Sequence, residues 1–146
     1  MAGKTDYLEN KWLALLFNAA NIANIADNAA SSPLTTLYLS LHTSDPTDAA
    51  NAQTTNECNY VSYARVGVAR NSSGWTVTGN SVSPVNPVVF ATAGTGTSSQ
   101  TATHVGIGTA ASGAGQLLLV GALSPAIAIV EGVTPEFKTT STVTED

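Results

Sequence analysis

The stretch that decides the fold is Thr36-Leu37-Tyr38-Leu39-Ser40-Leu41-His42-Thr43. Leucine occupies every second position from 37 to 41, and polar or aromatic residues stand between the leucines. Because successive side chains of a strand point to opposite faces, this alternation predicts a β-strand with one buried face. Ser44-Asp45-Pro46-Thr47-Asp48 follows, and these residue types favour a turn that ends the strand.

Further short β runs follow toward the C-terminus, separated by Gly, Pro and Ser. The predicted strands cover residues 60–70, 75–78, 88–91, 103–109, 116–123, 126–130 and 138–144. Short Thr- and Val-rich runs with turn signals between them are typical of an all-β sandwich. The sequence therefore predicts an all-β fold, an antiparallel, jelly-roll-like β-sandwich. The run Gln116 to Leu123 is apolar at almost every position, so we expect cover on both faces, from the opposite sheet and from the helix or another subunit.

One short N-terminal helix is predicted before these strands. Asp6 and Glu9 form a variant of the capping box, and apolar residues then recur at helical spacing over about residues 7–19. The helix is apolar around much of its circumference, so it needs more than one neighbour to cover it. Either it lies across one end of its own sandwich, or a partner subunit supplies part of the cover. Residues 18–33 repeat Asn and Ala and predict a loop-like arm, either a spacer or a segment that docks on a neighbouring subunit.

The surplus apolar surface of the helix supplies the candidate assembly residues. We expect contacts with another subunit from Trp12, Leu16 and Phe17 on the helix, and from Ile22 and Ile25 on the arm. The length of the chain fits a single domain over residues 1–146, with enough core to fold without covalent staples.

Composition excludes several classes of partner. Only 10% of the residues are charged, and five Lys and Arg against ten Asp and Glu give a net charge of -5, so nucleic acid is not expected as a partner. Cys58 is the single cysteine, and with only two histidines no zinc framework can be written. No apolar run is long enough to span a membrane, and no targeting signal is recognised at the N-terminus. We expect no cofactor or metal.

His104 is the best candidate for a catalytic base, with Ser40, Ser62 or Ser112 as nucleophile and Asp45 or Asp48 as the orienting acid. None of the serines stands in a Gly-x-Ser-x-Gly nucleophile elbow. A histidine that alternates with Thr103 and Val105 in a strand is more often a hydrogen-bonded structural residue. The sequence thus predicts a protein that is not an enzyme.

The segment Gly106-Ile107-Gly108-Thr109-Ala110-Ala111 fits a dinucleotide-binding fingerprint, with Glu131 at a suitable distance for a ribose ligand. That fingerprint works by aiming a helix N-terminus at a pyrophosphate, whereas another β run follows here. We therefore interpret both glycines as positions of close backbone approach or of a β-bulge.

Several motifs spread along the chain resemble a known family. They are Thr5 to Lys11 (TDYLENK), Leu37 to Leu41 (LYLSL), Thr43 to Asp48 (TSDPTD), Tyr63 to Val66 (YARV), Thr103 to Ile107 (THVGI), Gly121 to Leu123 (GAL) and Gly132 to Pro135 (GVTP). Together these motifs resemble a family of small virion structural proteins of tailed bacteriophages. The resemblance implies a β-sandwich that serves as a building block without enzymatic activity, made in the cytoplasm of the bacterial host and located in the virion.

The resemblance leaves two placements and a third class open. The first expectation is a capsid decoration, or cement, protein on the outer head surface, a homotrimer that binds the major capsid protein. The alternative is a tail or tail-fibre component that contacts tail proteins. The third is a surface carbohydrate-binding module, which would use Trp75, Tyr38, Tyr60 and Tyr63 as stacking platforms.

Overall fold

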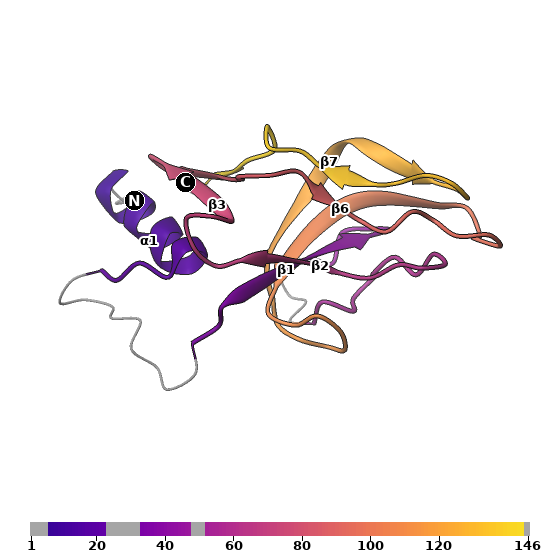
Figure 1. Ribbon diagram of the computed structural model, residues 1–146, viewed down its shortest axis with the longest axis horizontal. Coiled ribbons are helices and arrows are strands. Elements are labelled where there is room, and N and C mark those ends of the chain that lie inside the picture. The colour runs from indigo at the N-terminus through magenta and orange to yellow at the C-terminus, as the bar shows by residue number, and fades with distance from the viewer. Residues whose placement is uncertain (1–5, 23–32, 48–51, 145–146) are drawn as a thin grey trace. The chain divides into compact units, whose positions relative to one another are not determined.

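The computed structural model describes residues 6–22, 33–47 and 52–144 and consists mostly of antiparallel sheets with a single short helix (Figure 1). This sandwich-like, all-β class confirms the prediction. The elements are α1 (Asp6–Asn18), β1 (Thr36–His42), β2 (Val66–Ala69), β3 (Trp75–Thr78), β4 (Ser81–Pro84), β5 (Val88–Val89), β6 (Gln100–Gly108), β7 (Leu117–Ile129), β8 (Glu136–Phe137) and β9 (Val143–Thr144).

The chain forms two compact units, each assembled from separate segments. Unit 1 contains residues 1–36, 68–87 and 138–146, and unit 2 contains residues 37–67 and 88–137. The expectation of one domain over residues 1–146 stays a prediction. The two units are described separately below.

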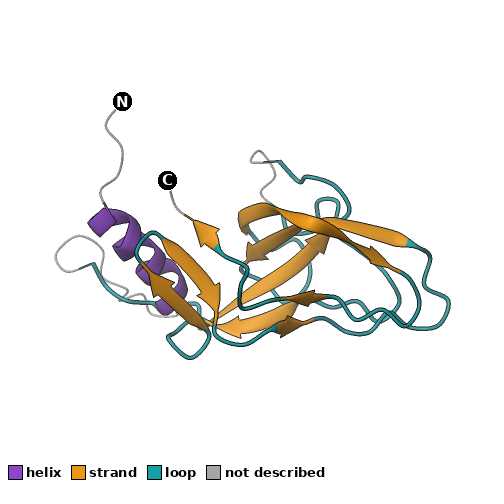
Figure 2. Ribbon diagram, turned by 90° about the horizontal axis from the view of Figure 1, so that it is seen from above, coloured by secondary structure: helices purple, strands orange, loops and turns teal. Residues whose placement is uncertain are grey.

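In unit 1 the helix packs against β3 and β4 (Figure 2), which form a three-stranded sheet with β9 in the order β3-β4-β9. The ring of Phe17 lies edge-on to the indole of Trp75, with ring centroids 4.7 Å apart, and both side chains are buried. The amide of Asn10 donates a hydrogen bond to the carbonyl of Gly79, in the turn between β3 and β4. These contacts explain why a short helix, marginal by itself in water, is held in place.

Most of the four-stranded sheet, in the order β2-β1-β6-β7, lies in unit 2, and the two-stranded β5-β8 sheet belongs to the same unit. In this sheet Leu39 pairs with Ile107, and His42 pairs with His104. The prediction that β1 buries only one face is wrong, because Ser40 and His42 on the polar face are also fully buried. Hydrogen bonds to residues of the 52–57 segment cover that face.

Aromatic side chains cover part of unit 2. Tyr60 and Tyr63 make an edge contact with centroids 5.2 Å apart, and Phe90 stacks on Tyr63. The hydroxyl of Tyr60 donates to the carbonyl of Ala91, and the hydroxyl of Tyr63 accepts from the backbone N–H of Leu41. Residues 60–65 were predicted as part of a strand, but strand pairing begins only at Val66.

The predicted strand boundaries differ from the structure in three further places. Residues 116–123 and 126–130 form one strand, β7, because Ser124 and Pro125 lie in a bulge between register-matched segments rather than in a turn. The sequence does not predict β4 or β8, since β4 ends at a proline, a residue type that breaks strand patterns, and β8 is too short to show a period. The strand predicted over 138–144 reduces to β9.

Candidate assembly surface

Ser40 and His42 form a hydrogen-bonded hydroxyl–imidazole pair, the arrangement that a serine nucleophile and its base would have. The Nδ1 atom of His42 lies 2.8 Å from the carbonyl oxygen of Thr55, which can only accept, so this nitrogen carries the proton. The Nε2 atom then accepts from the hydroxyl of Ser40 at 2.9 Å. Burial lowers the pKa of His42, with the bond to Thr55 acting in the opposite direction, so the ring is neutral near pH 7. Because neither residue is exposed, the pair has no access to a substrate.

The candidate base His104 is not part of that pair. Its Nε2 atom lies 3.9 Å from a carboxylate oxygen of Asp45, and its Nδ1 atom lies 2.9 Å from the hydroxyl of Thr103. Among the hydrogen bonds of the described residues, no serine is placed on this ring; Ser40 is bonded to His42 instead. Of the predicted catalytic combination, the structure therefore places the acid Asp45 near His104, but no serine nucleophile is bonded to that histidine.

A second polar cluster, Glu57-Tyr63-Arg65, fixes the loop between β6 and β7. The guanidinium of Arg65 makes two hydrogen bonds of 2.7 Å to the carboxylate of Glu57, and the hydroxyl of Tyr63 donates to the same carboxylate. Arg65 also donates to the carbonyls of Ala110 and Gly113. Each of the three guanidinium nitrogens donates a hydrogen bond within the protein, which is the geometry of a structural clamp rather than of an open anion site.

Gly106 and Gly108 have the structural role predicted for them. A Cβ atom on Gly106 would lie 2.6 Å from Nε2 of His42, and one on Gly108 would lie 2.2 Å from the side-chain carbonyl carbon of Gln53. Gln53 is fully buried; it donates to the carbonyl of Tyr38 and accepts from the N–H of Ala110. The register also shifts between Ile107 and Gly108, so both close approach and a β-bulge occur here.

The predicted assembly residues of the helix and arm differ in how far their side chains are buried. Trp12 is about half exposed at 49%, whereas Phe17 and Ile22 are interior residues. Leu16 is half-buried, and Ile25 lies outside the described residues. Phe17 packs against Trp75 within unit 1. The assembly interface expected from the sequence stays a prediction, and Trp12 is its most exposed described residue.

The strand β7 is the larger apolar surface, and its exposure corrects the expectation for residues 116–123. No residue from Leu117 to Leu123 is buried, although we expected cover on both faces. β7 is also the end strand of the four-stranded sheet, so one of its edges has no neighbouring strand among the described residues. The sequence pattern alone gives apolar character and does not distinguish an end strand from a central one.

The stacking platforms proposed for a carbohydrate are mostly occupied by the protein itself. Trp75 and Tyr60 are buried, and the hydroxyl of Tyr63 is held between Leu41 and Glu57. Within the described residues, no group of three or more His, Cys, Asp or Glu is placed to hold a metal ion. In the same part of the chain, no helix is both long and apolar enough to cross a membrane.

The described residues form a sandwich-like β fold with an exposed apolar end strand, and the polar clusters are engaged within the protein. A comparison with protein families shows to which family the chain belongs. The family model of Gp80, described as podophage GP4 fiber I protein gp80, matches residues 3–145. The chain belongs to this family and is a bacteriophage virion structural protein, which confirms the resemblance noted in the sequence. The search of curated proteins found no match.

Proposed function

We propose that this protein is a structural subunit of a virion fibre and acts by association with copies of itself and with tail proteins. The observation that carries the proposal is the match of residues 3–145 to a family described as a fiber protein. The open edge of β7 and the exposed Trp12 supply surfaces for association. We propose a purely structural role without catalysis, since the polar pairs are buried or engaged by the protein itself.

Head decoration is the second candidate. Its support is the small size and acidic charge of the chain and its lack of a long fibrous repeat. In that case a homotrimer would bind the major capsid protein on the outer shell, and many weak contacts would add up over the lattice.

Copy number and position on the particle separate the two candidates. The experiment quantifies this protein against the major capsid protein on gels of purified virions and locates a C-terminal tag by immunogold labelling. A fibre subunit gives few copies per particle, with label confined to appendages. Label spread evenly over the head, with a copy number close to that of the capsid protein, would refute the fibre proposal and support decoration.

A further inference from the structure

The polar face of β1 in unit 2 is covered by residues 52–58, which we call the 52–58 cover. Two backbone hydrogen bonds of 2.8 Å, from Thr43 to Asn56 and from Cys58 to Leu41, tie this cover to the end of β1. An isolated bridge is its only strand pairing among the described residues, whereas β1 pairs with β6 along most of its length. Segments outside the regular ladder open more readily than central strands. The cover can therefore open while β1 and β6 stay paired.

The ring of His42 lies under this cover and is bonded as a neutral imidazole. Its Nδ1–H donates to the carbonyl of Thr55 in the cover, and its Nε2 accepts from the hydroxyl of Ser40. The ring is fully buried, and burial lowers the pKa of His42 below 6.5. A proton on Nε2 would remove the acceptor of the Ser40 hydroxyl, and the other acceptor of that hydroxyl, the carbonyl of Gly106, lies 3.5 Å away. The closed cover therefore requires a neutral ring.

The groups around His42 leave a positive charge on its ring without a free counter-ion. The titratable and charged side chains nearby come from the cover, the segment before β2, β6 and the turn after β1, and they are Glu57, Tyr63, Arg65, His104 and Asp45.

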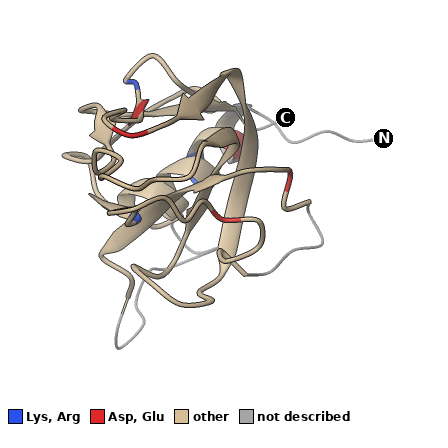
Figure 3. Ribbon diagram, turned by 90° about the vertical axis from the view of Figure 1, so that its right-hand side faces the viewer, with Lys and Arg blue, Asp and Glu red and all other residues tan. Residues whose placement is uncertain are grey.

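Charged side chains are sparse along the described chain, so few acids are available to balance that charge (Figure 3). Glu57 favours protonation of His42, but its carboxylate already accepts from the guanidinium of Arg65 at 2.7 Å. Arg65 and His104 both oppose protonation, and Asp45 lies 3.9 Å from His104. A charged His42 is therefore stabilised only where water can reach it.

We propose that the 52–58 cover is an acid-sensitive switch, closed over a neutral His42 and released when that ring takes up a proton, while β1 and β6 stay paired. The open form returns the charged imidazole to water and exposes the polar face of β1. Release takes up one proton, so the opening equilibrium increases by up to about tenfold for each pH unit below 6.5, until the pH reaches the lower pKa of the closed form. The switch goes beyond the proposed structural role, because it belongs to the single subunit wherever that subunit lies in the virion.

Cys58, the single cysteine of the chain, reports the opening of the cover. It is 2% exposed, and burial raises the pKa of its thiol to about 11, so the closed form is unreactive. The wild type is labelled with 4,4′-dithiodipyridine, and each rate is divided by that of the urea-unfolded protein at the same pH. This normalised rate should rise as the pH is lowered from 7.5 to 5.5, by up to about tenfold for each unit below 6.5. A normalised rate that stays constant or falls would overturn the proposal.

Two histidine variants assign the effect to one ring. His42→Gln removes the titrating group under the cover, so its normalised rate should not depend on pH in this range. His104→Gln removes the imidazole of the paired strand and keeps His42, so the rise with acid should persist. An equal rise in His42→Gln, or no rise in His104→Gln, would contradict the assignment to His42.

A second cysteine position separates release of the cover from unfolding of the sheet. In a background with Cys58→Ser, Val105→Cys places the thiol at a buried position on the opposite face of the sheet. Its normalised rate should lie well below that of Cys58 in the wild type at every pH. Equal rates at the two positions would show that the unit opens as a whole, without a separate cover.

Hydrogen exchange on the wild type tests the switch without any substitution. The N–H groups of Thr43 and Cys58 are bonded between β1 and the cover. After correction for the intrinsic exchange rate, both should lose protection between pH 7.5 and pH 5.5, while the N–H groups that pair β1 with β6 keep theirs. The same change in both sets, or no change in either, would refute the switch.

Discussion

Gly106 is the residue where β6 passes closest to the buried ring of His42. The space for a Cβ atom is filled, since it would also lie 2.8 Å from the hydroxyl oxygen of Ser40. The neighbouring strand offers a matched position at Gly121, where nothing lies within 4 Å.

We predict that Gly106→Ala destabilises the protein by about 1–3 kcal/mol, because an added methyl group overpacks a filled site. Gly121→Ala should remain within about 0.5 kcal/mol of the wild type. Urea unfolding followed by circular dichroism measures both. Equal stability of the two variants would show that the Ser40 and His42 side chains move aside without cost.

The buried ring of His42 makes stability depend on pH. Burial lowers its pKa below the usual 6.5, so the folded protein binds fewer protons at this site than the unfolded chain. The stabilisation is fully present above pH 6.5 and decreases as the pH falls through that value toward the lower pKa of the folded state. Protonation would also remove the acceptor for the Ser40 hydroxyl.

We therefore predict that the free energy of unfolding of the wild type decreases between pH 7.5 and pH 5.5, and that His42→Gln shows a smaller decrease. Urea titrations at a series of pH values measure the difference. Parallel pH profiles for the two proteins would assign the dependence to other groups.

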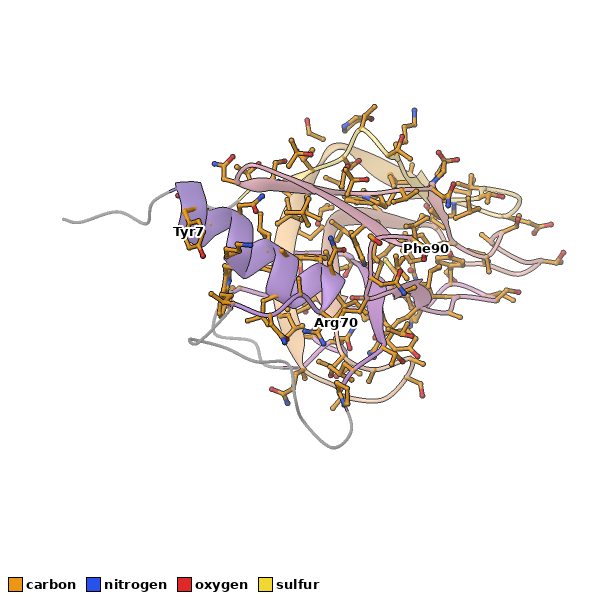
Figure 4. All side chains as sticks on the ribbon, turned by 60° about the vertical axis from the view of Figure 1, so that its left-hand side comes forward. Tyr7, Arg70 and Phe90 are labelled. Atoms are coloured by element: carbon orange, nitrogen blue, oxygen red, sulfur yellow. The ribbon has the colours of Figure 1, made fainter. Side chains whose placement is uncertain are left out.

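At the scale of elements, Arg70 fixes the end of α1. Its guanidinium donates to the carbonyls of Leu15 and Leu16 at 2.6 and 2.5 Å and to the carbonyl of Leu34 at 3.1 Å (Figure 4). The last carbonyls of a helix have no hydrogen-bond partner within the helix. A cation at this end also interacts favourably with the negative end of the helix dipole. The chain leaves the helix through Ala19 in the left-handed region, at φ 53°, and the N–H of Ala20 donates to the carbonyl of Ala14. Arg70 adds to this backbone cap, because it engages the carbonyls of Leu15 and Leu16.

We predict that Arg70→Lys loses about 1.5–3 kcal/mol of stability, because an ammonium group cannot reproduce the planar fork that reaches these carbonyls. Lys11→Ala is the control on the same helix, where the ammonium lies 5.7 Å from the centroid of the Tyr7 ring. An exposed cation–π contact is worth about 0.5–1 kcal/mol, so this loss should be smaller. Thermal unfolding compares the two. If Arg70→Lys is as stable as the wild type, the positive charge alone stabilises the helix end, and the hydrogen-bond geometry of the guanidinium does not matter.

At the scale of the whole molecule, charge is unevenly distributed along the chain. The net charge of -5 comes from residues outside 71–130, while the exposed strand β7 lies inside that uncharged stretch. Association through β7 therefore gains nothing from ion pairs and acts against a general repulsion between two acidic copies.

We predict that raising the sodium chloride concentration leaves self-association of the wild type unchanged or strengthens it, because salt screens that repulsion. Light scattering over a concentration series at low and high salt measures the effect. Self-association that weakens as salt rises would place charged residues in the interface, away from β7.

The sequence by itself determined the β character of the chain, the position of the helix and the membership in a phage structural family. These follow from local period, capping residues and motifs, which a linear sequence records directly. Tertiary structure alone decided which apolar residues are covered. Phe17 and Leu118 are equally apolar in the sequence, but Phe17 packs against Trp75 while Leu118 lies in the end strand of a sheet. Strand order depends on contacts between distant segments, and the periodicity of a single segment carries no information about them.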